Sequence, residues 1–226
     1  MTRRNGVRTA ARAPQACALP GELATLDATT LVWEDEAAFE AVELIGTAPA
    51  GVTARHLKLA GSRIRATLGS AKLGGLHLVN AEIRGADLAN VAMAGAGLQR
   101  TRIAGTRMTG ATLSGASLRD VALADTRLDL ASFAEARLDR VAFAGCDLRE
   151  ASFSEARLRD VRFERCDLSG AEFPRAAVQR VEFARCELTG LRAISDLRGA
   201  TLPWPDIVGN AGLFAAALGI GVIDDE

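Results

Sequence analysis

A large apolar residue recurs at every fifth position through more than half of this chain. The series begins at Leu68 and ends at Leu188, and all 25 of its members are apolar. Two residues before each member lies a compact or apolar residue, such as Ala66, Thr101 or Val121. Each five-residue unit therefore carries a small and a large inward residue, separated by one residue that points outward.

Neither standard secondary structure can continue through this period. Five residues advance an α-helix by about 500°, which is about 140° past a full turn, so residues five apart do not share a buried face. On a continuous strand, an odd period sends every second large residue to the solvent side. The pattern instead predicts three extended residues followed by a bend, so that the chain winds around its own core.

The residues at the expected bends agree with this interpretation. The second residue after the large one is Gly in nine units, and a tight turn can require positive φ there. Asn or Asp occupies the same position in others, for example Asn80, Asp120 and Asp160. We therefore expect a turn at the end of each unit.

A longer period of 20 residues gives the size of one coil. Cysteine recurs at this spacing, and phenylalanine forms two such series offset by ten residues. Four units thus complete one coil, and successive coils would stack about 4.8 Å apart. The predicted inward core columns contain Phe133, Phe143, Phe153, Phe163, Phe173, Phe183, Cys146, Cys166 and Cys186.

Several units resemble the consensus of the pentapeptide-repeat family. Residues 86–90 (Ala-Asp-Leu-Ala-Asn), 146–150 (Cys-Asp-Leu-Arg-Glu) and 166–170 (Cys-Asp-Leu-Ser-Gly) carry its Ala or Cys, its Asp and its Leu. The resemblance covers residues 66–190 and implies an all-β fold, the right-handed quadrilateral β-helix with four repeats in each coil. We expect the regular β-helix to span residues 66–192.

The N-terminal third departs from this regularity. Residues 1–22 contain several arginines but no apolar run typical of an export signal, so we expect a disordered basic tail and a cytoplasmic protein. Residues 23–65 are predicted to form irregular coils. The step from Ile64 to Leu68 is four residues long, which predicts a kink there, and the turn residues of 45–54 predict a loop that leaves the coil.

The C-terminal residues 193–226 are expected to form a capping α-helix and an acidic tail. The prolines and Asp206 around position 204 are typical of a helix entry. Apolar residues then follow at helical spacing. Either a cap over the open end of the coil or a cap that also forms a homodimer contact fits these residues, which are Trp204, Ile207, Phe214 and Leu218.

Groupings that carry chemistry are not evident in the sequence. The cysteines at 20-residue spacing are expected to be buried free thiols, although the coil spacing would also allow a strained disulfide. The two histidines, His56 and His77, have no second ligand nearby. We therefore expect no enzymatic activity, no metal and no cofactor.

Charge and hydropathy limit the classes of partner. The chain has 27 basic and 28 acidic residues, which gives no excess for direct nucleic-acid binding, and no stretch approaches the roughly 20 apolar residues of a membrane span. Asp147, Asp167 and Glu187 form an outward acidic row that Arg107 and Arg127 continue. This row is either a solvated mixed-charge face or a partner-binding site.

Two functions fit the sequence. The first is a rigid interaction scaffold with an unknown protein partner, for which Arg55 and His56, beside the predicted loop, are further candidate contacts. The second follows from the resemblance, because the family includes quinolone-resistance members that bind DNA gyrase as mimics of DNA. Residues 66–190 contain 16 acids and 17 bases, which is not the strongly negative field of a DNA mimic.

Overall fold

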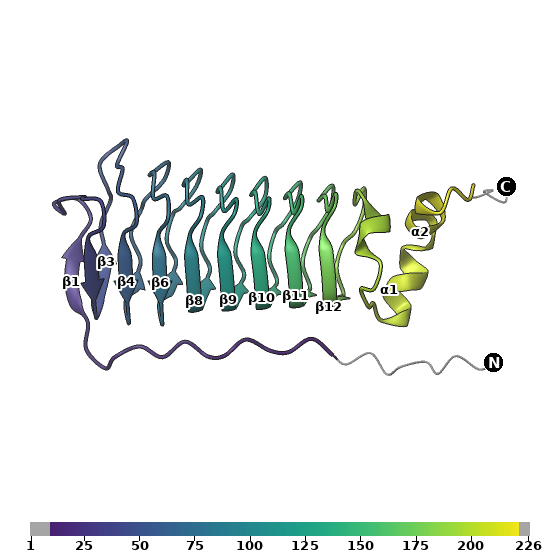
Figure 1. Ribbon diagram of the computed structural model, residues 1–226, viewed down its shortest axis with the longest axis horizontal. Coiled ribbons are helices and arrows are strands. Elements are labelled where there is room, and N and C mark those ends of the chain that lie inside the picture. The colour runs from purple at the N-terminus through teal and green to yellow at the C-terminus, as the bar shows by residue number, and fades with distance from the viewer. Residues whose placement is uncertain (1–9, 222–226) are drawn as a thin grey trace.

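Short parallel strands, stacked coil upon coil, form the body of the computed structural model, which describes residues 10–221 (Figure 1). The four-sided coil predicted from the 20-residue period and the all-β architecture implied by the family resemblance are confirmed. In chain order the strands are β1 (Ala24–Asp27), β2 (Ala38–Glu40), β3 (Val42–Ile45), β4 (Lys58–Ala60), β5 (Arg63–Ile64), β6 (His77–Val79), β7 (Glu82–Arg84), β8 (Gly97–Ala104), β9 (Ser117–Ala124), β10 (Arg137–Ala144), β11 (Arg157–Glu164) and β12 (Ala177–Ala184).

The strands β8 to β12 each cover two sides of the coil. They bend in the middle at a residue with positive φ, for example Arg140 in β10 with φ 55°. Along one side the sheet order is β1-β3-β5-β7-β8-β9-β10-β11-β12, and β2, β4 and β6 stack on the adjoining side up to β8. The remaining two sides are joined by isolated bridges such as Asp147 to Asp167 and Ser132 to Ser152.

The register of the sheet follows the 20-residue period. Phe143 lies opposite Phe163, and Phe163 lies opposite Phe183. These three rings stack with centroids 4.9 Å apart and planes 7° from parallel. The second series, Phe133, Phe153 and Phe173, stacks at 4.9 and 4.7 Å and meets the first series edge to face. The interior is thus filled by two interlocking columns of aromatic rings.

The cysteine column is inward and its thiols are free. Cys146 and Cys166 are buried, whereas Cys186, one coil from the end, is half-buried. Each Sγ donates to carbonyl oxygens of its own and the preceding coil, as Cys166 does to Phe143 and Glu164 at 3.5 Å. A hydrogen bond with Cys166 and burial raise the pKa of the Cys186 thiol. These groups therefore act as small core residues.

The irregular N-terminal coils are more regular than the sequence suggested. The four-residue step is real, because Ile64 pairs with Ile83 at an offset of 19 residues whereas Thr67 pairs with Asp87 at an offset of 20. The prediction that residues 45–54 form a loop leaving the coil is wrong, because Thr47 and Thr53 both pair with the next coil. The step between these two residues is six, which is one more than the regular step of five. The segment is therefore a slightly enlarged corner of the coil.

The N-terminal segment also differs from the prediction. Residues 10–20, here named the strap, run extended along the length of the coil rather than forming a disordered tail (Figure 1). Hydrogen bonds from strap backbone N–H groups to Glu182, Asp160 and Asp120 hold the strap in place. Residues 1–9 of the predicted tail lie outside the described residues.

The C-terminal end is a cap of three short helices rather than the single helix expected. They are η1 (Ile194–Leu197), α1 (Trp204–Gly209) and α2 (Ala211–Ala217), and Asn210 caps both α1 and α2. On the last coil, the N–H groups of Arg175 and Arg185 have no following coil to bond, and the carboxylates of Asp196 and Asp206 accept from them instead. The cap thereby satisfies backbone groups that an open edge would expose. Within residues 10–221 no helix is both long and apolar enough to cross a membrane.

Candidate interaction surfaces

The outward residues of opposite sides of the coil carry opposite excess charge. One side, here named the acidic side, carries Asp87, Arg107, Arg127, Asp129, Asp147, Arg149, Glu150, Asp167 and Glu187, which are six acids and three bases. The opposite side, here named the basic side, carries Arg100, Arg119, Asp120, Arg137, Asp139, Arg140, Arg157, Arg159, Asp160 and Arg180, which are seven bases and three acids. A nearly neutral chain is therefore folded into a rod that is electrically uneven across its width.

The predicted acidic row is assembled by stacking. Asp147 is bridged to Asp167, and Asp167 to Glu187, so three carboxylates lie on successive coils. Arg149 donates to Asp147 at 2.6 Å, and its Nε lies 3.8 Å from Asp167. This hydrogen bond is the main reason that the pKa of Asp147 is lowered. Arginine therefore neutralises the beginning of the row more than its end.

Local hydrogen bonds orient the other two carboxylates of the row. Asp167 accepts from the hydroxyl of Ser169 at 2.6 Å, and Glu187 accepts from the backbone N–H of Thr189 at 3.0 Å and from its hydroxyl. The Thr189 hydroxyl lowers the pKa of Glu187. Each of these carboxylates is thus fixed in orientation by a neighbouring hydroxyl.

Arg55 and His56 do not join this row. Arg55 pairs with Asp35 at 2.8 Å on the first coils, and the ring of His56 lies beside Gly75. His56 lies at the same corner of the coil as Glu155, a residue of the coil that carries Asp147, but five coils earlier along the rod. Five coils correspond to about 24 Å at the usual strand spacing. The sequence-predicted partner residues therefore form two separate places on the rod.

The exposed arginines of the basic side share few acids. Asp139 is half-buried and lies within 3.9 Å of Arg119, 2.9 Å of Arg140 and 3.3 Å of Arg159. Arg137 and Arg157 are exposed on the same side, and no ion pair is formed by either within residues 10–221. This side therefore presents two guanidinium groups on successive coils, those of Arg137 and Arg157, that no ion pair within residues 10–221 compensates.

A charged column lies at the corner where the long strands bend. From the sequence its Asn and Asp members are interpreted only as turn residues, and its arginines are not singled out. This corner column consists of Asn80, Arg100, Asp120, Arg140, Asp160 and Arg180. Its neighbours bond in pairs, and Arg140 donates to Asp120 at 2.6 and 2.8 Å. Reading the turn positions at 20-residue spacing would have revealed the alternation of acid and arginine.

The acids of the corner column are buried although they are charged. Side-chain exposure is 3% for Asp120 and 0% for Asp160, because the strap covers them. Arg180 donates to Asp160 at 2.5 and 2.6 Å, and this pairing lowers the pKa of Asp160 to about 2. Both acids are thus held ionised beneath the strap.

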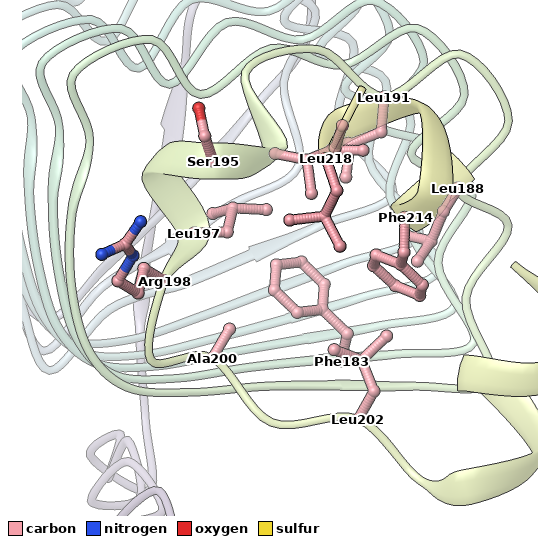
Figure 2. Close-up of a pocket in the computed structure, with 12 residues that line it drawn as sticks. Phe183, Leu188, Leu191, Ser195, Leu197, Arg198, Ala200, Leu202, Phe214 and Leu218 are labelled. Carbon is pink, nitrogen blue, oxygen red and sulfur yellow. The ribbon is translucent and has the colours of Figure 1, made fainter. Parts of the chain in front are cut away.

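The C-terminal end contains an apolar cavity of about 390 Å³ between the last coil and the cap (Figure 2). Phe183 and Leu188 line it from the coil, and Leu197, Phe214 and Leu218 line it from the cap. Of the residues predicted to cap or dimerise, Ile207 and Phe214 are half-buried, whereas Trp204 is 74% and Leu218 76% exposed. The cap therefore closes the core only in part.

Side chains suited to binding a metal are not gathered at these surfaces within residues 10–221. Within the part of the chain that the structure describes, no three His, Cys, Asp or Glu side chains are placed to hold a metal ion. The surfaces consist of charged rows, a covered corner column and an apolar end.

Together the five-residue unit and the four-sided coil define a solenoid scaffold. A family model described as "Pentapeptide repeat region" matches residues 116–193, and another described as "Pentapeptide repeats (8 copies)" matches residues 96–134. Residues 96–193 therefore match pentapeptide-repeat families, as the resemblance in the sequence predicted. No curated protein matches it.

Solved structures of the same fold are similar to this chain. QnrB1, a plasmid-mediated fluoroquinolone resistance protein, is 22% identical in a trypsin-treated form, with 81% of this chain and 99% of that chain covered and a TM-score of 0.48. HetL, involved in heterocyst differentiation regulation in the cyanobacterium Nostoc sp. strain PCC 7120, is 22% identical, with 75% and 91% covered and a TM-score of 0.31. Likeness at this level concerns the fold and does not indicate a shared partner.

Proposed function

We propose that this chain is a non-enzymatic scaffold that binds a partner protein through the charged rows of its coil. The observation that carries the proposal is the excess of acids on one side of the rod and of bases on the opposite side. Complementary charge orients a partner and raises the rate of productive encounters more than it raises affinity. A stiff rod with two unlike sides would hold its partner in one orientation.

The acidic row is the proposed contact on the acidic side. Like charges directly opposite one another in neighbouring strands are destabilising, and Asp167 and Glu187 form such a pair. No arginine pairs with Glu187 in the described residues. A basic patch on a partner would supply the missing positive charge at this end of the row.

The test compares charge-neutralising variants of the full chain. The partner would be captured from a lysate with immobilised protein, identified by mass spectrometry, and then purified for binding measurements. The row variant combines Asp147→Asn, Asp167→Asn and Glu187→Gln. Each of the three carboxylates would form one exposed ion pair with the partner, which contributes up to about 1 kcal/mol. Loss of these three pairs predicts a loss of affinity on the order of tenfold and a weaker dependence of binding on salt.

A matched control removes the same number of charges from the neighbouring side of the coil. It combines Glu135→Gln, Glu155→Gln and Glu172→Gln, and its affinity should stay within about twofold of the wild type. Equal losses in the two triple variants would show that net charge, and not the acidic row, governs binding. That result would refute the proposed site.

Gyrase is the partner that the resemblance to quinolone-resistance members would suggest. A mimic of DNA needs a continuous negative field, whereas Arg107 and Arg127 interrupt the acidic side. We therefore favour a different protein partner. If micromolar protein altered gyrase supercoiling or its sensitivity to quinolones, gyrase would replace the unknown partner in this proposal.

Self-association at the C-terminal end is proposed as a second interaction. The exposed Trp204 and Leu218, together with the cavity that Leu218 lines, form an apolar end that a second copy could cover. Light scattering coupled to size exclusion should then give twice the chain mass, and Trp204→Ala with Leu218→Ser should give the monomer mass. A wild-type protein that stays monomeric at high concentration would refute this contact.

A further inference from the structure

The strap spans six coils of the solenoid. Its Ala11 bonds Glu182 on the coil of β12, and its Pro20 lies beside Gly61 of an early coil. Figure 1 shows the strap running past the strands from β1 to β12. Six coils measure about 29 Å at the usual strand spacing, and nine residue steps of extended chain measure about 30 Å. The strap is therefore almost fully extended over the whole of this distance.

The strap is held through its backbone. The N–H of Ala11 donates to Glu182 Oε1 at 2.7 Å, and the N–H groups of Arg12 and Gln15 each donate at 3.1 Å to Oδ1 of Asp160 and Asp120. Side-chain carboxylates from three coils thus recognise main-chain amides at relative positions 1, 2 and 5. Bonds of this kind, from an N–H to an ionised oxygen, are stronger than neutral ones.

Strap side chains contribute little to this docking. Seven of its eleven residues are Ala or Pro, and none of the eleven is buried. The one side-chain hydrogen bond from strap to coil runs from Cys17 Sγ to the carbonyl oxygen of Ala81 at 3.3 Å. A different extended segment with small side chains would satisfy the same acceptors.

Two of the three carboxylates are oriented without the strap. Arg140 holds both oxygens of Asp120, and Arg180 holds both oxygens of Asp160, and all four residues belong to the coil. Removing the strap would leave these pairs in place and expose the Oδ1 atoms that accept from it. The corner column is therefore a preformed row of acceptors rather than one created by the strap.

We propose that the corner column, together with Glu182 on the coil of Arg180, is a binding surface for an extended, Ala- and Pro-rich segment of a partner protein, and that the strap is its intramolecular occupant. Ordering eleven residues costs conformational entropy that cancels much of what the hydrogen bonds contribute, so the strap is displaceable. A partner segment with free N–H groups at the same three positions takes its place. This surface lies on a different side of the coil from the acidic row, and the proposal is independent of the one made for that row.

The test uses the full chain and a fluorescent synthetic peptide of residues 10–21 as the probe. The release variant combines Arg12→Pro and Gln15→Pro, which remove two N–H donors while proline remains compatible with an extended chain. The control combines Ala13→Pro and Ala16→Pro. Within the described residues the N–H groups of Ala13 and Ala16 form no hydrogen bond, so the control adds two prolines without removing a bond.

Fluorescence anisotropy should show that the release variant binds the probe at least about tenfold more tightly than the wild type and the control do. The reason is that the docked strap lowers the apparent affinity for the probe in proportion to the fraction of molecules whose corner column is uncovered. Adding Asp120→Asn and Asp160→Asn to the release variant should weaken binding of the probe about tenfold. A second probe with proline at positions 12 and 15 should not bind. Circular dichroism of each variant establishes that the coil is intact.

Three results would overturn the proposal. One is equal probe affinity in the release variant and the control, and another is a release variant with an intact coil that does not bind the probe. The third comes from hydrogen exchange of the wild-type chain. If the amides of Arg12 and Gln15 exchange as fast as they do in the free peptide, the strap is not docked.

Discussion

The aromatic columns make a quantitative test of the interior possible at Phe153. Its ring is fully buried and stacks on Phe133 at 4.9 Å and on Phe173 at 4.7 Å. It also meets Phe143 and Phe163 edge to face at 6.4 and 5.8 Å. Phe153→Ala would therefore remove one ring from contact with four others.

The expected loss of stability lies at the upper end of the usual range. Truncating a buried Phe to Ala costs about 3–5 kcal/mol, and an aromatic pair contributes roughly 0.5–1.5 kcal/mol beyond its buried area. Two stacked partners lie on adjacent coils that cannot move closer without breaking their backbone ladder. We therefore expect the free energy of unfolding to fall by about 4–5 kcal/mol.

Urea denaturation followed by circular dichroism would measure this loss, with linear extrapolation to water. Phe39→Ala is the matched control, because Phe39 occupies the second coil and is only half-buried. Its truncation should cost less than half as much. If Phe153→Ala cost under about 2 kcal/mol, or no more than Phe39→Ala, the interior could not be packed as stacked rings.

Two further predictions concern a buried charge and a corner. Pairing with Arg180 lowers the pKa of Asp160 from 3.8 to about 2. The stability that this ionised pair contributes is therefore present above about pH 4 and is lost as the pH falls toward about 2. Urea denaturation across this range should show a loss of about 2 kcal/mol that is absent in Asp160→Asn. Gly75→Ala should destabilise the coil by roughly 1 kcal/mol more than Gly95→Ala. Both glycines have positive φ, but only at Gly75 would an added Cβ come within 2.4 Å of the His56 ring. Equal urea midpoints for the two variants would contradict the placement of that ring.

The two charged sides and the strap give the scaffold separable interactions. The acidic row is open to solvent, whereas the corner column is covered by eleven residues of the same chain. A partner of the acidic side can bind without moving the strap. A partner of the corner column must displace the strap, so its occupancy would depend on competition as well as on intrinsic affinity.

Most of the coil could be predicted from the sequence because the information is local and repeated. Each unit specifies which side chains turn inward, and the 20-residue period then fixes that Phe143 stacks on Phe163. Burial of one large residue in every five leaves no other regular conformation. The four-residue step at Ile64 was equally visible as a break in phase.

The strap and the corner column were decided by tertiary structure alone. The strap is recognised through backbone N–H groups, which every residue except proline carries and which sequence therefore does not distinguish. Asp120 and Asp160 look like ordinary turn residues until stacking places them beside Arg140 and Arg180 and beneath the strap. A period in the chain determines where side chains point, but only the folded coil determines which distant segment lies across them.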